Sequence, residues 1–317
     1  MKMSEFVLSL RLNFMQMSVP AKLLLLLLMV LFFLILGSAA AVMIAVPLFG
    51  YDMNTLYRLI GNPDPDQIAV VKFFQIVQSV FLFILPSLLA AWLFSTNTGK
   101  YLQADRKASP YTLLLVLVSL FIAVPVMNFV TYYNTKLDLP DGLSGLENAM
   151  KTMEESAGKL TELFLESNSY GDLAVNFLMI AILPAIGEEF LFRGILQKLF
   201  IDWTKSIHVG VILAAFIFSF IHFQFYGFIP RFLLGLYFGY LLVWSSSIWV
   251  PVAAHLINNG IAVVYYHFAT QPMGDTMMDK LGTEQRGHYA LYLSVFFTSA
   301  IIGMIYLHER QVKTTVF

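Results

Sequence analysis

The sequence predicts an all-α, polytopic membrane helical bundle of about eight transmembrane helices. Of its 317 residues, 58% are hydrophobic and only 12% are charged, whereas soluble domains carry about 25% charged residues. The mean hydropathy is +0.74, and the apolar runs are continuous, without the period-two alternation of barrel strands. The lipid bilayer is therefore the first expected partner.

The same composition argues against several other kinds of protein. The formal net charge of −1 gives no sign of a nucleic-acid partner. The chain contains no cysteine, which excludes disulfides, cysteine-ligated zinc and a thiol nucleophile.

Each predicted helix is an apolar window long enough to cross a hydrocarbon core of about 30 Å. The windows are 23–48, 70–95, 111–133, 172–201, 207–226, 230–246, 249–268 and 289–307. The first run could pass for a secretory signal, but it continues from Leu24 to Leu48, which is too long for a signal core. We expect it to remain as an uncleaved first helix.

Lysine and arginine predict the orientation of the bundle. If every window spans once, the basic segments fall on one side, and they contain Lys2, Arg11, Lys22, Lys100, Arg106, Lys107, Lys205, Arg310 and Lys313. Basic loops face the cytoplasm, so both termini are predicted to be cytoplasmic.

The segment 134–170 is the only sizeable polar region, and we expect it to lie outside the membrane. Its apolar residues recur at helical spacing, which predicts an amphipathic helix packed on the outer face or lying at the interface. These residues are Leu146, Met150, Met153, Leu160 and Phe164. A solvated helical hairpin and a lid or substrate clamp both fit this pattern.

We expect one membrane domain with three parts. Residues 1–170 hold the first membrane helices and the 134–170 segment, residues 171–268 hold the helices with the polar residues considered next, and residues 269–317 hold the last helix and a cytoplasmic tail. The sequence contains no internal repeat.

Three charged residues, Glu188, Glu189 and Arg193, lie in one of the most apolar stretches of the chain. A charged side chain at bilayer depth costs on the order of 2.5–3.5 kcal/mol. Glu189 and Arg193 are four residues apart and share a helix face in the favourable order, so they can neutralise each other. Glu188 has no such partner, and an unpaired carboxyl in apolar surroundings can serve as a base. By themselves, the three residues fit a bracing ion-pair network equally well.

His222, His255 and Asn259 interrupt two further apolar runs. Counted from the turn near 203–206, Glu188 and His222 lie about equally far away, roughly 24 Å along each helix, so an antiparallel pair would let them share one water. His255 and Asn259 line one face and can donate hydrogen bonds, as an oxyanion site requires. By counting residues along its predicted helix, His255 lies nearer the cytoplasmic face than His222. Either the 245–250 segment enters the membrane, or helix tilt brings His255 and His222 to the same depth.

Other polar and small residues have simpler interpretations. Two histidines and one glutamate allow a zinc site, but the chain has no His-Glu-x-x-His motif. No metal or other cofactor is therefore expected, and zinc stays as the alternative. Gly235 and Gly239 predict a close helix contact. Arg231, at a helix start, is expected to snorkel to the interface.

These residues, in this order, resemble the CPBP family of CAAX proteases and bacteriocin-processing enzymes, also called the ABI family. The matching motifs are Glu188-Glu189-Phe-Leu-Phe-Arg193, Phe218-Ser-Phe-Ile-His222 and His255-Leu-Ile-Asn-Asn259. The resemblance covers about 171–268 and leaves the first three helices and the 134–170 segment outside it.

The resemblance implies an intramembrane endopeptidase of the glutamate type, acting on a peptide or protein substrate. In that scheme Glu188 and His222 hold and deprotonate a water, and His255 and Asn259 stabilise the oxyanion. Glu189 and Arg193 support this geometry.

Two other functions remain open on the sequence. The chain could be a non-proteolytic scaffold, or an immunity or regulatory protein of the same family. Such a protein would keep the motifs, but the motif residues would catalyse no reaction. A proton-relaying transporter would more often show internal repeats. The expected location is the plasma membrane of a bacterium, and the sequence leaves the substrate open.

Overall fold

Helices form most of the described chain. The computed structural model describes residues 3–61, 67–166, 169–268, 280–283 and 288–315. No strand occurs in these ranges, so the predicted all-α class is confirmed. In chain order the α-helices are α1 (Met3–Gln16), α2 (Val19–Phe49), α3 (Met53–Gly61), α4 (Ile68–Ser79), α5 (Leu85–Phe94), α6 (Thr98–Tyr101), α7 (Pro110–Ile122), α8 (Val124–Asn134), α9 (Ser144–Leu165), α10 (Tyr170–Asn176), α11 (Leu183–Glu188), α12 (Lys198–Thr204), α13 (Ile207–Phe220), α14 (Phe228–Ser245), α15 (Trp249–Phe268) and α17 (His288–Thr315).

Three π-helical segments join some of these helices into longer ones. They are η2 (Val80–Ile84), η4 (Phe177–Ile182) and η5 (Glu189–Gln197). As a result, Ile68–Phe94 and Tyr170–Thr204 each run as one continuous helix. π-Helical turns inside longer helices are rare and are frequent at functional sites, and η5 contains two of the three charged residues singled out above.

The chain is a multi-pass integral membrane protein. Among the described residues, five helices are long and apolar enough to cross a membrane, or six if the α7–α8 pair, bent by 48°, counts as one span. Each of the eight predicted windows is largely helical, but α13 is a shorter apolar helix and α15 does not meet the same criterion. The number of eight crossings therefore stays a prediction.

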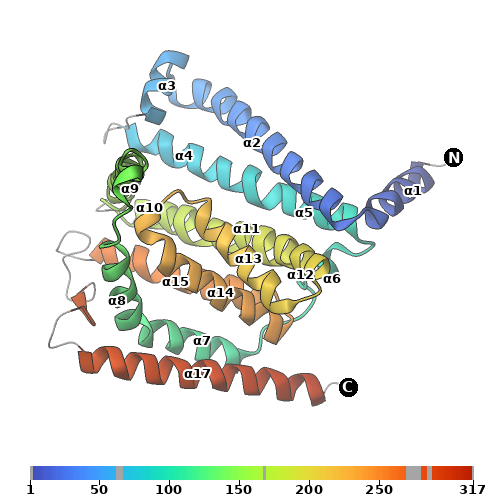
Figure 1. Ribbon diagram of the computed structural model, residues 1–317. Coiled ribbons are helices and arrows are strands. Elements are labelled where there is room, and N and C mark those ends of the chain that lie inside the picture. Colours follow the sequence, from blue (N-terminus) through green and yellow to red (C-terminus); the bar gives the residue numbers. More distant parts are fainter. Residues whose placement is uncertain (1–2, 62–66, 167–168, 269–279, 284–287, 316–317) are drawn as a thin grey trace.

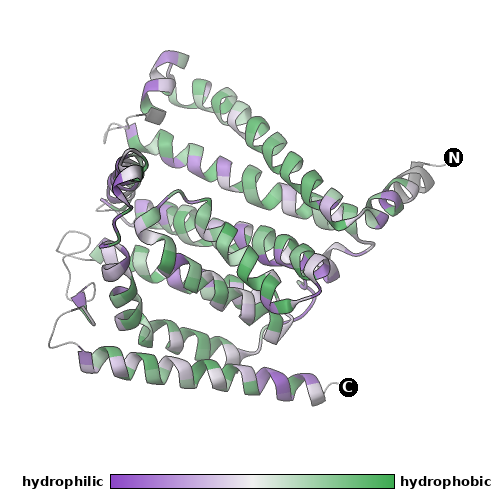
Figure 2. Ribbon diagram, in the orientation of Figure 1, coloured by the Kyte–Doolittle hydropathy of each residue, from purple (hydrophilic) through white to green (hydrophobic). Residues whose placement is uncertain are grey.

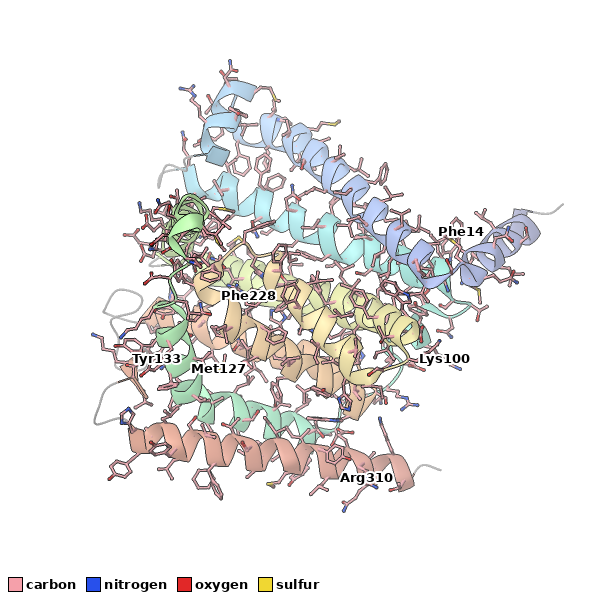
Figure 3. All side chains as sticks on the ribbon, viewed as in Figure 1. Phe14, Lys100, Met127, Tyr133, Phe228 and Arg310 are labelled. Carbon is pink, nitrogen blue, oxygen red and sulfur yellow. The ribbon has the colours of Figure 1, made fainter. Side chains whose placement is uncertain are left out.

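Both termini lie at the same end of the bundle (Figure 1). Figure 3 places Lys100 and Arg310 at that end, and Tyr133 and Phe228 toward the opposite one. This arrangement is what a one-sided distribution of basic residues requires, while the cytoplasmic location of that end stays a prediction. The long helices carry apolar residues along their length (Figure 2), and many of these are exposed on the outer surface, such as Ile35 on α2 and Phe296 on α17.

The helix Tyr170–Thr204 lies at the centre of the bundle. In its most apolar window 56% of the residues are buried, against 17–28% in the other long apolar helices. It packs against α5, α13, α14 and α15, and every residue from Gly187 to Ile195 is buried. The three charged residues in this stretch therefore face protein, as the cost of exposing charge to lipid requires.

The predicted close contact at Gly235 and Gly239 is confirmed. A Cβ atom at Gly239 would lie 2.7 Å from Gln197 Oε1, and one at Gly235 would lie 3.0 Å from the Ala215 Cβ. The absence of side chains lets the α14 backbone approach the central helix and α13, and it exposes the two glycine carbonyls to donors on η5.

The segment 134–170 forms the predicted helix, α9, but not with the predicted buried face. Phe164 is buried, whereas Leu146 is 54% and Met153 is 46% exposed. Contacts with α4, α10 and α15 explain the difference, because they fix the C-terminal half of α9 against the bundle. In Figure 1, α9 lies across the end of the bundle opposite the termini.

The helix predicted over 207–226 is shorter than expected. α13 ends at Phe220, and the short η6 (Phe225–Gly227) leads into α14. Phe223 has φ 52°, in the left-handed region, which a right-handed helix cannot continue through. His222 therefore lies in a turn just after α13 and not inside a helix.

Candidate active site

All four residues predicted to be catalytic line one cavity. This cavity has a volume of about 550 Å³ and is lined by Glu188, His222, His255 and Asn259. They come from the central helix, the turn after α13, and α15. Helices that are distant in sequence thus bring the three motifs to one place.

Glu189, Arg193 and His255 form a buried, hydrogen-bonded network beneath the cavity. Arg193 Nη1 donates to Glu189 Oε1 at 2.8 Å, and His255 Nδ1 lies 2.8 Å from the same oxygen. Arg193 Nη2 also donates to the Gly235 carbonyl, and its guanidinium lies over the Phe218 ring at 4.4 Å. Glu189 and Arg193 are 0% and 1% exposed, so the pair is fully sheltered from solvent.

This network fixes the state of the His255 ring. Since an ionised carboxylate only accepts hydrogen bonds, His255 Nδ1 must carry a proton that it donates to Glu189. Phe238 stacks on one side of the ring, with 5.4 Å between centroids. The other ring nitrogen, Nε2, lies 3.9 Å from Glu188 Oε2. A carboxylate that fixes a histidine in this way sets both its tautomer and its orientation.

Glu188 differs from Glu189 as the sequence predicted. It lines the cavity at 9% exposure, and its 3.9 Å approach to His255 is too long for a hydrogen bond. No hydrogen bond joins its carboxylate to any residue in the described ranges. Its oxygens are thus available to a water or substrate in the cavity, whereas Glu189 is engaged by Arg193 and His255.

His222 is held by the C-terminal end of α13, the helix that it follows. Its Nδ1 lies 2.6 Å from the Phe218 carbonyl oxygen, which α13 leaves free at its last turn. Nδ1 is therefore the donor, and Nε2 is the nitrogen without a proton in the neutral ring. The edge of the Phe218 ring further fixes this position, with 5.2 Å between ring centroids.

Asn259 reaches the cavity with part of its hydrogen-bonding capacity used. Its Nδ2 donates to the Ile180 carbonyl at 3.0 Å, and its Oδ1 accepts from Asn258 Nδ2 at 3.0 Å. An amide nitrogen carries two protons, so one donor of Asn259 remains for a ligand. The predicted oxyanion donor is thus present in the cavity, and Asn258 supports it.

A buried turn precedes the helix that carries His255. Ser247 and Ile248, between α14 and α15, are 1% and 0% exposed. The Ile248 amide donates to the Gln103 carbonyl, and the Ser247 hydroxyl donates to the Arg106 carbonyl. The loop 102–109 thus covers this turn, and His255, in the second turn of α15, lies 3.9 Å from Glu188. Whether the 245–250 segment enters the membrane or helix tilt brings the two residues together stays a prediction.

Comparison with known proteins identifies the segment that carries this cavity. Residues 170–261 match the family described as type II CAAX prenyl endopeptidase Rce1-like, which is part of the CPBP family. Residues 170–261 are similar to this family and form the Rce1-like segment of the chain. The uncharacterized protein YpbD of Bacillus subtilis (strain 168) is 28% identical over 97 residues, which are 29% of this chain and 47% of that protein. The chain thus spans about half the length of this curated relative. No solved structure matches the chain.

The Rce1-like segment contains every predicted catalytic and supporting residue, and two lining residues that sequence reasoning missed. Asn258 and Arg231 both line the cavity. Arg231 was expected to snorkel to the interface, which stays a prediction; its half-buried side chain lines the cavity, and its Nη2 donates to Gln224 Oε1 at 2.6 Å. No pattern of spacing signals this role, since only the turn 221–227 brings Arg231 back over the cavity.

The wall of the cavity extends beyond the Rce1-like segment. Thr161 and Phe164 of α9 line it, as do Gln75 of α4 and Thr131 of α8. α9 therefore contributes side chains to the wall, and the lid or substrate clamp stays a prediction.

The geometry also bears on metal binding. Within the described ranges, no group of three or more His, Cys, Asp or Glu residues is arranged to hold a metal ion.

Proposed function

We propose that this chain is an intramembrane endopeptidase of the glutamate type, related to the type II CAAX prenyl endopeptidases. The observation that carries the proposal is the contrast between two adjacent carboxylates: Glu189 is paired beneath the cavity, whereas Glu188 faces the cavity without a hydrogen bond to a described residue. The match of residues 170–261 to that family supports it.

In the proposed reaction, a water is held between the Glu188 carboxylate and Nε2 of His222. Glu188 takes one proton of the water as general base. The resulting hydroxide attacks the scissile carbonyl carbon, and the π electrons of the carbonyl move to its oxygen. When the tetrahedral intermediate collapses, the C–N bond breaks, and Glu188 returns the proton to the leaving amine. The histidine and the carboxylate thus act on one water, and no covalent intermediate forms.

His255 and Asn259 would stabilise the oxyanion. Since His255 Nδ1 donates to Glu189, its Nε2 can donate only if the ring is an imidazolium. Glu189 fixes the orientation of this ring and is itself held by Arg193. Asn259 supplies its remaining amide proton. Donors placed where negative charge develops are commonly worth about 10²–10³ in rate, which is the role we assign to these two residues.

The test compares new peptide termini in membranes containing wild type, Glu188→Gln or Glu162→Gln. Glu162 is an exposed acid on α9, so its replacement is the matched control. We expect specific termini in the wild type and the control and their loss in Glu188→Gln, with the variant still folded and inserted. Identical profiles in all three would instead favour the non-proteolytic scaffold or immunity protein.

Three further expectations belong to this proposal. We expect activity to survive prolonged dialysis against a chelator, whereas a zinc-dependent reaction would stop and recover on zinc addition. The substrate is a peptide or protein, and no nucleic acid takes part. The location is the plasma membrane of a bacterium, which the Bacillus subtilis relative supports.

A further inference from the structure

Among the described residues, the cavity is lined by one guanidinium, that of Arg231, which the proposed reaction does not use. Arg231 lies in the first turn of α14 and lines the same cavity as Glu188 and His222. Its Nη2 donates to Gln224 Oε1 at 2.6 Å. The guanidinium packs over Gly227, where a Cβ atom would lie 3.1 Å from Nη2. Glycine therefore provides the space that this side chain occupies.

One end of this guanidinium is buried without a partner. Nη1 of Arg231 is inaccessible to solvent and has no hydrogen bond to any residue in the described part of the chain. Buried polar groups in proteins are nearly always hydrogen-bonded, and each exception needs an explanation. For arginine the need is greater, since the group stays protonated at all physiological pH values.

Arg231 contrasts with Arg193, which lies beneath the cavity. Arg193 is paired with Glu189 at 2.8 Å and is covered by Phe218 and Phe238. Arg231 forms no ion pair with a described residue, and its charge interacts with the Glu154 and Glu188 carboxylates only at longer range. Arg231 therefore presents to a ligand in the cavity a positive charge that no ion pair with a described residue engages.

A planar guanidinium with a free donor matches a carboxylate better than any other common group of a peptide. We infer that Arg231, oriented by Gln224, binds a carboxylate of the substrate and so determines which peptides are accepted. This inference rests on the proposed peptidase function. The carboxylate belongs either to a chain terminus or to an Asp or Glu side chain of the substrate, and the experiment separates these two sources.

The test uses matched peptides that differ in one carboxylate. A substrate peptide found by the terminus comparison is made as the C-terminal acid and the C-terminal amide, and each acidic side chain is changed in turn to its amide. In wild type we expect kcat/KM to fall roughly ten- to hundredfold for the peptide that lacks the recognised carboxylate, which is the ratio one charged hydrogen bond provides. The fall should lie mainly in KM.

Two variants separate recognition from folding. Arg231→Gln removes the cation, and Gln224→Glu leaves Arg231 in place but supplies it with an internal carboxylate. Both should abolish the discrimination between acid and amide peptides. Arg58→Gln, at an exposed arginine on α3, is the control and should keep it. Preference retained in Arg231→Gln, or equal use of all peptides by wild type, would overturn the assignment.

A binding measurement keeps this test independent of the catalytic proposal. Fluorescently labelled versions of these peptides are titrated into Glu188→Gln protein in micelles. A peptide with a free C-terminal carboxylate and the same peptide with a C-terminal amide serve as standards. Discrimination that disappears in the Glu188→Gln/Arg231→Gln double variant supports the carboxylate site even if wild type cleaves nothing. Equal binding of every acid and amide pair contradicts it even if cleavage is found.

Discussion

The buried pair of Glu189 and Arg193 allows a quantitative prediction. Arg193→Met removes the cation and leaves Glu189 at 0% exposure, with Oε1 bonded only to His255 and Oε2 without a partner in the described ranges. Breaking a buried pair by removing one member costs about 3–5 kcal/mol, because the remaining charge is uncompensated. Whole domains are stable by only about 5–15 kcal/mol, so this single variant should lose a large part of the total.

The double variant Glu189→Gln/Arg193→Met tests whether charge is the cause. It removes both charges and keeps an amide at position 189 that can still bond to His255. If the two groups acted independently, their separate costs would add to roughly 6–10 kcal/mol. The second replacement removes the charge stranded by the first. We therefore expect the destabilisation of the double variant to be about 3 kcal/mol smaller than this sum.

The assay is reversible unfolding in mixed micelles with increasing SDS, followed by tryptophan fluorescence. Lys151→Met is the matched control, because Lys151 and Glu147 form an ion pair with the same spacing at 2.6 Å, but Lys151 is 46% exposed. Exposed pairs contribute little to stability, so the control should unfold like wild type. Arg193→Met behaving like the control, or single costs that simply add in the double variant, would refute the reasoning.

Two further predictions concern close packing and pH. Gly210→Ala should destabilise the protein by about 1–3 kcal/mol, because its Cβ would lie 2.8 Å from the Ile201 backbone nitrogen; Gly303→Ala, with nothing within 4 Å, should be neutral or stabilising in the same unfolding assay. Burial raises the pKa of Glu154 on α9 above 4.5, so docking of α9 is favoured below that value and weakens as the pH rises through the raised pKa. The chain contains no cysteine, so a spin label on Lys159→Cys reports only α9. Its mobility should increase with pH in wild type and much less in Glu154→Gln, and a flat wild-type profile would contradict this.

The sequence was most informative where the physics is local. Apolar windows give helices because a bilayer leaves backbone groups no other partners, and the described windows are largely helical. The spacing of Glu189 and Arg193 predicted their ion pair, since residues four apart meet on a helix surface. The contrast with Glu188 also follows from local spacing, because the sequence offers it no charge one turn away.

Local patterns were least reliable where the chain changes direction. His222 was placed inside a helix that ends before it, at the turn that includes Phe223 in the left-handed region. Leu146 and Met153 have the spacing of a buried face, yet they are exposed, because only the C-terminal half of α9 is fixed against the bundle. Hydrophobic spacing shows that a face is apolar but does not show how much of it a neighbour covers.

By itself, then, the sequence determined an all-helical membrane protein, the pairing of Glu189 with Arg193, and the three motifs of an Rce1-like segment. The tertiary structure decided that His255 is held by Glu189 and faces Glu188, and that Arg231 turns into the cavity. The contact between His255 and Glu189 joins residues 66 positions apart. These contacts depend on where helices start and how closely glycines let them approach, and a one-dimensional pattern of hydrophobicity carries neither quantity.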